Sequence, residues 1–571
     1  MSSQEYFSRL PEWAASLARD VTAKTATLYV LHGAPQDLVR GSKGTFGRLE
    51  TFLADDVFGT RASVLTFNRA EGFGFGSPEA RSHFYRTLTG EDAGLEALPR
   101  DPLRALPLFD RYLRRALLES PPRSMLVLFP FAETLAPGGD ALSLSPEDRA
   151  SIIWLRRWSQ DPVLRAADVT IVLETENLSD LDGKLVRSPY TRAIEIPRAS
   201  AEDRAEFLSA LRPPDWYSRR CELPLPGFVS ATAGMTRLQL QQIADAADSG
   251  DVRIRAADLM AEKSRIIEAE CYGLLEFVRS PFTLADVAGH EGVKSRLRAA
   301  ARAIARGEVN RVPQGYLICG PVGSAKTFLV NAFSGEIGFP VVRLLNFRSQ
   351  WQGVTEANVE KILKVLASLN PVVVVIDEAD AFLGNREQQG DSGTSNRVFA
   401  ALSSFMGETR YRGRIVWFLI TSRPDLIPID LKRQGRAEEH LALFYPASAG
   451  EYDELFRILV KKSNARSPVG KLTDLLDPAS KDLSGADLEA ILSRALLRSP
   501  EGSNEVSAEA LKSAFEDFLP ATPRLEREYQ ILTAALECTS REILPGDLQG
   551  RSAEDLHARL AEVRDLLRSR R

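Results

Sequence analysis

The segment GYLICGPVGSAKTFL, residues Gly315–Leu329, joins an apolar strand-like run to an apolar helical pattern through a glycine-rich loop. In a phosphate-binding loop, backbone N–H groups and the N-terminus of the next helix hold phosphate oxygens. The required glycines, lysine and hydroxyl residue occur here in the right order: Gly320, Gly323, Lys326 and Thr327. The other interpretation is a glycine-rich turn between a strand and a helix. The spacing favours a nucleotide-binding loop.

One position departs from the usual loop, because Ala325 replaces a glycine. Its N–H remains available, and its methyl group matters only if the loop needs a positive φ or a very close phosphate there. We expect Lys326 to reach the β and γ phosphates and the Thr327 hydroxyl to bind Mg²⁺. The predicted nucleotide-binding residues of the loop are Gly320, Pro321, Val322, Gly323, Ser324, Ala325, Lys326, Thr327 and Phe328.

Two carboxylates follow the next strongly apolar run, NPVVVVIDEADAFL, residues 370–383. The β-branched run predicts a buried parallel strand, whose carboxyl end lies at the sheet edge where ligands bind. Asp377 suits the Mg²⁺ shell, and Glu378 suits polarising an attacking water. Either carboxylate alone is explained equally well by solvation. Both together, in order after Lys326, complete a Walker A and Walker B pair.

A third strand-like run, GRIVWFLITSRPDL, ends in Thr421 and Ser422, whose hydroxyl groups could touch the γ phosphate or the water. Arg433 and Arg436 follow shortly after it. A charged surface explains two arginines equally well. In an oligomeric ATPase, arginines at this place reach the neighbouring subunit's γ phosphate and stabilise the transition state.

With these residues in view, residues 282–520 resemble the AAA family of ring ATPases, most of all the branch of the valosin-containing protein and the membrane AAA proteases. FTLADVAGHEGVKSRL resembles the family's entry segment, and LSGADLEAILSRAL resembles its lid signature. The resemblance implies ATP and Mg²⁺ as cofactors and places Gly485 and Ala486 near the adenine. Ser422 stands where the family has an asparagine. The predicted catalytic residues are Glu378, Lys326, Arg433, Arg436 and Ser422.

The segment NFRSQWQGVTEANVEKIL indicates what the energy of ATP hydrolysis would be used for. Trp351 and Gly353 match the family's pore-loop pattern of an aromatic residue, any residue and glycine. A tryptophan is more often buried as local core, but the polar neighbours favour a pore residue here. The resemblance therefore implies a protein substrate that is gripped in a central channel.

The front half has no nucleotide motif but reads as five strands alternating with helices, followed by a helical stretch. This order predicts a parallel sheet and matches that of an AAA module. Pro130 and Phe131 stand where two carboxylates are needed, and Lys43 is followed by Gly44. We expect a degenerate AAA-like module that does not hydrolyse ATP; the alternative is an unrelated α/β docking domain. The glycine-rich stretch 69–80 is interpreted as a flexible surface loop.

The predicted fold class is therefore α/β. A P-loop (AAA+) parallel sheet with a helical lid follows a second, degenerate AAA-like α/β module with its own lid. We divide the chain into a degenerate domain (1–199), a helical lid or linker (200–280), an active large subdomain (281–445), a helical lid (446–520) and a C-terminal helical extension (521–571). The extension is expected to pack on its own or a neighbouring subunit.

Composition narrows the possible functions. The 571 residues carry a net charge of -5, which disfavours nucleic acid as a partner. The four cysteines have no metal-ligand spacing, and the apolar runs are too short to insert in a membrane, so we expect a cytoplasmic protein. The leading hypothesis is a homo-oligomeric, hexameric ring ATPase that remodels, unfolds or disassembles a protein substrate. The alternative is a nucleotide-gated assembly factor or scaffold for a large protein complex, without threading.

Overall fold

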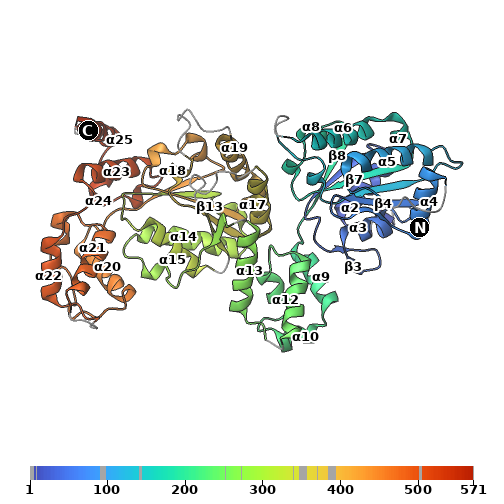
Figure 1. Ribbon diagram of the computed structural model, residues 1–571. Coiled ribbons are helices and arrows are strands. Elements are labelled where there is room, and N and C mark those ends of the chain that lie inside the picture. The colour runs from blue at the N-terminus through green and yellow to red at the C-terminus, as the bar shows by residue number, and fades with distance from the viewer. Residues whose placement is uncertain are drawn as a thin grey trace. The chain divides into compact units, whose positions relative to one another are not determined.

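The computed structural model describes most of the chain as two compact units, which are treated separately below (Figure 1). The first, called the front unit, comprises Met1–Lys263 with Glu356–Lys364. The second, called the rear unit, comprises Ser264–Thr355 with Val365–Arg571. The described residues are 6–7, 9–90, 98–139, 144–250, 253–271, 273–337, 340–345, 356–369, 371–383, 394–499 and 504–569.

The front unit is built on a six-stranded sheet in the order β5-β4-β6-β7-β1-β8. All neighbours pair in parallel except β4 and β5, which are antiparallel. The strands β6 and β7 are buried along their whole length, as expected for parallel strands covered on both faces. The strand bounds are β1 Leu28–Gly33, β4 Ser63–Asn68, β5 Gly72–Phe75, β6 Met125–Phe129, β7 Val169–Glu174 and β8 Thr191–Ile196.

Helices cover both faces of this sheet (Figure 1). Apolar side chains of α4, α5 and α6 form the core on one face, and those of α2 and α3 form it on the other. Ser145 begins α6 with a capping box to Asp148, which satisfies backbone N–H groups at the helix start. The bounds are α2 Glu12–Thr22, α3 Leu49–Phe52, α4 Pro78–Thr89, α5 Pro102–Ala116, α6 Pro146–Gln160, α7 Pro162–Ala166 and α8 Gly183–Val186.

The prediction of a flexible loop over 69–80 is wrong, because Gly72–Phe75 forms the edge strand β5. The ring of Phe73 stacks on that of Phe109 with centroids 4.6 Å apart. A Cβ on Gly74 would lie 2.1 Å from Oγ1 of Thr66, so only glycine lets the two strands approach. The glycines that suggested a loop are therefore required for strand pairing.

A helical segment follows the front sheet and is tied to it by a buried carboxylate. Asp37, in the loop after β1, accepts hydrogen bonds from the backbone N–H groups of Leu38 and Leu238 and forms an ion pair with Arg237. The start of α12 is thus bound to the loop after β1 through Asp37. The helices are α9 Ala201–Leu211, α10 Pro214–Arg220, α11 Leu225–Ala231, α12 Arg237–Ser249 and α13 Ala256–Glu270.

The rear unit repeats the same sheet. Its order is β14-β10-β13-β12-β11-β9. The five parallel strands match the front order read from β8 to β4, and both sheets end in an antiparallel strand, but β9 precedes the parallel strands in the chain whereas β5 follows β4. This repetition confirms the predicted fold class of two α/β modules with helical segments. The strands are β9 Leu275–Phe277, β10 Gly315–Cys319, β11 Val341–Leu344, β12 Val372–Ile376, β13 Ile415–Thr421 and β14 Glu439–Ala442.

One face of the rear sheet is covered by α14 (Glu291–Ala305) and α15 (Lys326–Glu336). The lid consists of α20, α21 and α22, and the C-terminal extension of α23, α24 and α25 packs on the strand ends of this same unit. No helix in the described ranges is long and apolar enough to span a membrane. The remaining bounds are α17 Glu356–Leu369, α18 Ala379–Leu383, α19 Thr394–Met406, α20 Ala449–Lys462, α21 Gly485–Leu497, α22 Ala508–Asp517, α23 Arg524–Glu537, α24 Gly546–Gln549 and α25 Ala553–Ser569.

The edge strand gives a first testable prediction. Phe73→Ala should lower the free energy of unfolding of the front unit by about 2 kcal/mol, because it removes a partly buried ring that packs against the core. Urea unfolding followed by circular dichroism measures this change. Leu118→Ala is the control, since Leu118 is 85% exposed and should change stability by less than about 0.5 kcal/mol. Equal, small effects of the two substitutions would contradict the packed strand.

Candidate nucleotide-binding site

The loop after β10 lies tightly against its surroundings at both glycines. Gly320 has φ +147°, and a Cβ there would lie 2.1 Å from the carbonyl oxygen of Leu443. Gly323 has φ +84°, and a Cβ there would lie 2.6 Å from Oγ of Ser484, at the start of the lid helix α21. Only glycine fits at these two positions without displacing the end of β14 or the lid.

Ala325 occupies the left-handed region, with φ +64° and ψ +25°, directly before α15. The sequence left open whether the loop needs a positive φ here, and the structure shows that it does. A side chain in this region brings Cβ close to the following carbonyl oxygen and costs about 1 kcal/mol. The alanine is therefore tolerated at an energetic cost.

Lys326 is buried and turned onto its own loop. Its Nζ donates hydrogen bonds to the carbonyl oxygens of Gly320 and Pro321, at 3.0 and 2.9 Å. Burial lowers the pKa of Lys326 to about 8. An anion placed in the loop would offer this ammonium group stronger partners than two neutral carbonyl groups.

A side-chain hydrogen bond joins the residue after β12 to the start of α15. Oγ1 of Thr327 donates to Oδ2 of Asp377 at 2.9 Å. The other carboxylate oxygen of Asp377 accepts the backbone N–H of Glu378, also at 2.9 Å. A hydroxyl and a carboxylate are the hard oxygen ligands that Mg²⁺ prefers, so this donor set fits that ion.

Glu378 is exposed and has φ +48°, an unusual backbone conformation for a residue other than glycine. In the front unit, Phe131 stands two residues after β6 just as Glu378 stands two residues after β12, and its φ is +56°. The two units thus share the same backbone corner. Only the rear corner carries carboxylates, because Pro130 and Phe131 replace them in the front unit.

The end of β13 contributes a hydrogen-bonded threonine. Oγ1 of Thr421 donates to Oδ1 of Asp380 at 2.6 Å and accepts the backbone N–H of Arg423 at 2.8 Å. Ser422 follows it and is half-buried. Sequence reasoning missed Asp380, although a third carboxylate so soon after Asp377 and Glu378 was visible.

A cavity of about 170 Å³ adjoins the loop, between the entry segment and the lid. Its mainly apolar lining fits a flat aromatic base. Gly485 and Ala486, which are predicted to lie near the adenine, line this cavity, and so do Val287 and His290, for which the sequence makes no such prediction. Burial lowers the pKa of His290 to about 4, so its ring is uncharged at neutral pH. Further lining residues are Asp286, Ala288, Gly323, Ser324, Ala325, Phe328, Leu455, Ile458, Leu459, Lys462 and Glu489.

The two predicted arginines lie outside this cavity. Arg433 is exposed, and in the part of the chain that the structure describes its side chain has no hydrogen-bond or ion-pair partner. Arg436 is half-buried and donates from Nη1 to the carbonyl oxygen of Asp430 at 2.8 Å. Burial, followed by the charge of Arg433, lowers the pKa of Arg436. Trp351 and Gly353 lie in 346–355, outside the described residues.

The strained alanine gives a second prediction. Ala325→Gly should raise the free energy of unfolding of the rear unit by about 1 kcal/mol, because glycine adopts the left-handed region freely. Differential scanning calorimetry should show an increase of about 2 to 4 °C in the rear unit's Tm. Ala299→Gly is the matched control, since Ala299 is exposed inside α14, where glycine should destabilise by about 1 kcal/mol. Shifts of the same sign would contradict the prediction.

Comparison with protein-family models gives three matches along the chain. Residues 5–197 match the AAA+ chaperone N-terminal Rossmann-like domain, and residues 202–272 match the AAA+ chaperone second helical domain. Residues 316–445 match the ATPase family associated with various cellular activities, AAA. The last match spans the phosphate loop, both carboxylates and the two arginines.

Curated relatives agree with these matches. The chain is 25% identical over 405 residues to an uncharacterized AAA domain-containing protein, ycf46, of Guillardia theta, covering 70% of this chain and 74% of the relative. It is 26% identical to a cell division cycle protein 48 homolog of Archaeoglobus fulgidus over 57% of this chain and 48% of that protein. It is 30% identical to the ATP-dependent zinc metalloprotease FtsH 1 of Rhodopirellula baltica, over 39% and 34%.

The chain thus spans about half or less of the length of the last two relatives. The three family models follow one another in the order of the structural elements, with the front sheet first, its helical segment next and the rear sheet last. Residues 5–197 and 202–272 are thus the N-terminal and second helical domains of the AAA+ chaperone type, and residues 316–445 are an AAA domain.

Proposed function

We propose that the rear site binds ATP with Mg²⁺ and hydrolyses it. The observation that carries this proposal is the hydrogen bond between Thr327 and Asp377, which brings the phosphate loop and the end of β12 together. Thr327 and Asp377 would hold the ion, which neutralises charge on the β and γ phosphates. Lys326 would leave the loop carbonyl groups for the phosphate oxygens.

Glu378 is the group proposed to act on water. It follows Asp377 directly, and its strained backbone holds it at the carboxyl end of the sheet. Its carboxylate would accept a hydrogen bond from the water that attacks the γ phosphorus, while ADP departs as the leaving group. Ser422, after β13, would contact the γ phosphate or this water. The cavity lined by Gly485 and Ala486 would receive the adenine.

The arginines support an oligomeric arrangement. Neither Arg433 nor Arg436 lines the cavity of its own subunit, and Arg433 extends from an exposed position. We infer that both contact the γ phosphate held by a neighbouring copy, where their charge stabilises the transition state. A head-to-tail contact of this kind closes into a ring, and we propose a hexameric homo-oligomer.

The work done by the ring is proposed to be the remodelling, unfolding or disassembly of a protein substrate. Trp351 and Gly353 would form the pore loop, and an aromatic side chain grips an extended chain with little sequence preference. The chaperone-type domains in front of the ATPase support a protein as substrate. The front unit, which has no carboxylates at its corner, would hold the ring or select the substrate. We place the protein in the cytoplasm and expect no nucleic-acid partner.

Mixing two inactive variants tests hydrolysis and the shared site together. Glu378→Gln and Arg433→Ala should each lower ATP turnover by at least about 100-fold, because one lacks the carboxylate and the other the arginine. In an equal mixture, about a quarter of the subunit contacts combine an intact Glu378 with an intact Arg433, so turnover should recover in part. Phosphate release measures this recovery. Turnover that does not recover would contradict a site shared between subunits.

The lowered pKa of Lys326 gives a prediction on pH. Phosphate oxygens beside the ammonium group raise its pKa again, so nucleotide binding should take up a proton above about pH 8, where the free lysine is neutral. Calorimetry of Mg²⁺–ADP binding in buffers of different ionisation enthalpy should show uptake of most of a proton per site at pH 8.5 and little at pH 7. Equal uptake at the two pH values would contradict the role of Lys326.

Trp351→Ala separates remodelling from the alternative of a nucleotide-gated assembly factor. If the ring threads a protein, the variant should hydrolyse ATP at nearly the wild-type rate but no longer remodel partners. Partners are first captured with the Glu378→Gln trap and identified by mass spectrometry, and their protease sensitivity with ATP is then compared. Remodelling that survives the substitution would favour the assembly factor.

A further inference from the structure

In the C-terminal extension, helix α23 (Arg524–Glu537) contacts the proposed nucleotide site of its own unit. This helix touches the phosphate loop, the start of the lid helix α21 and the segment after β13. In an ATPase of this kind, these three segments contact phosphate, adenine and the attacking water. None of the three family models reaches this helix, since the last of them ends at 445.

The contact with the phosphate loop fixes Val322. Its backbone N–H donates to Oε1 of Gln530 at 2.9 Å, and its carbonyl oxygen accepts the hydroxyl of Tyr445 at 2.8 Å. Both backbone polar groups of Val322 are therefore bound, although its side chain is 50% exposed. Gln530 is itself buried, so it approaches the loop from a fixed position.

The contact with the lid is a buried ion pair. Nη2 of Arg527 lies 3.0 Å from Oδ2 of Asp487, and the two side chains are 6% and 12% exposed. Nη1 of Arg527 donates to the carbonyl oxygen of Asp482. Asp487 also completes the capping box with Ser484, the residue that lies against Gly323. One arginine of α23 thus holds the lid at the point where it meets the phosphate loop.

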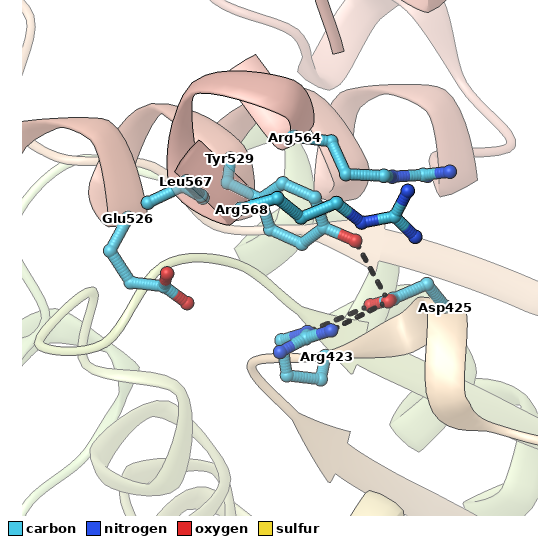
Figure 2. A pocket seen from close by; sticks show the side chains of 7 residues that line it. All are labelled: Arg423, Asp425, Glu526, Tyr529, Arg564, Leu567 and Arg568. Carbon is cyan, nitrogen blue, oxygen red and sulfur yellow. Dashed lines mark hydrogen bonds and ion pairs between the residues drawn. The ribbon is translucent and has the colours of Figure 1, made fainter. Parts of the chain in front are cut away.

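The third contact lies at the segment after β13 (Figure 2). The hydroxyl of Tyr529 donates to Oδ2 of Asp425 at 3.1 Å, and the guanidinium of Arg423 forms an ion pair with the same carboxylate at 2.9 Å. The guanidinium of Arg423 also lies 5.0 Å from the centre of the Tyr529 ring. Arg423 directly follows Ser422, and Asp425 lies two residues further on. This contact therefore holds the chain next to the residue proposed to contact the γ phosphate or the water.

Between these contacts, α23 is fixed to the strand ends of the rear sheet by apolar packing and by an ion pair. Leu532 and Ala535 pack with Cys319, at the end of β10, and with Phe444, after β14. At the far end of α23, Glu537 forms an ion pair with Lys432 at 2.8 Å. Dense packing resists compression and transmits displacement, so a shift of the phosphate loop also moves the lid contact.

We propose that α23 is a strap that positions the lid on the phosphate loop, and that Arg527 and Gln530 thereby set the affinity for nucleotide. Both are positioning residues, since they act through Asp487 and Val322. The inference rests on the proposed function, because it concerns the same site. Its physical basis is that a lid free to swing is in the binding-competent position for only a fraction of the time. The apparent Kd rises in inverse proportion to that fraction.

The experiment measures Mg²⁺–ADP binding by calorimetry at a temperature where every variant is folded. Arg527→Met should weaken binding about tenfold, and Asp487→Asn should weaken it by a similar factor. The double variant should be little worse than either single one, because both break the same link. Arg524→Ala is the matched control. It removes an arginine from the same helix whose side chain is 89% exposed. Its 3.6 Å ion pair with Asp482 lies in solvent and contributes little, so affinity should not change.

A readout of lid motion separates positioning from loss of fold. Hydrogen exchange of the amides in α21 with Mg²⁺–ADP bound should be faster in Arg527→Met than in the wild type, while exchange in β12 stays unchanged. Gln530→Met is a second, independent variant, which should weaken binding by at least about threefold. It keeps the proposal testable if the buried arginine cannot be replaced.

Two outcomes overturn the proposal, and they are distinguishable. If the wild type binds Mg²⁺–ADP and the variants at 527 and 530 bind it equally well, the strap is wrong while the proposed function stands. If the folded wild type binds no Mg²⁺–ADP, the proposed function fails and the strap fails with it. Additive effects of Arg527→Met and Asp487→Asn would also reject the link between these two residues.

Discussion

The hydrogen bond from Thr327 to Asp377 is the contact on which the rest of the site depends, because it joins two strand ends that are far apart in sequence. Parallel strands place their carboxyl ends at one sheet edge, and here β13 lies between β10 and β12. The hydroxyl follows one outer strand of this trio, the carboxylate follows the other, and Thr421 ends the middle one. The site therefore follows from strand order together with a few polar residues.

The two units show how little of this arrangement is needed for the fold itself. In both, the five parallel strands have the same order, and the second residue after the third of these strands has a positive φ. Phe131 holds that corner in the front unit and Glu378 holds it in the rear. The buried apolar strands stabilise both sheets alike, whereas chemistry depends on exposed or half-buried side chains at their ends. The architecture of such a module therefore does not require carboxylates at these two positions.

Much of this organisation was predictable from the sequence, because β-branched runs and a glycine-lysine loop have few other uses. The five front strands and the two α/β sheets with helical segments appear as expected. The edge strand at Phe73 was missed because its glycines suggested a loop, and they prove necessary only when Thr66 is seen opposite. The contact of α23 with the lid could not be read either, since Arg527 lies 40 residues from Asp487 and belongs to no motif.

The buried carboxylate of Asp37 in the front unit has a consequence for how the two modules respond to ligands. It occupies the backbone N–H of Leu238 and the guanidinium of Arg237, and so fastens the helical segment to the loop after β1 with a group that belongs to the chain. In the rear unit, α23 holds the lid near the loop after β10, and a bound nucleotide would add a second attachment that arrives and leaves. The front unit therefore keeps its helical segment attached to this loop without needing a ligand to do so.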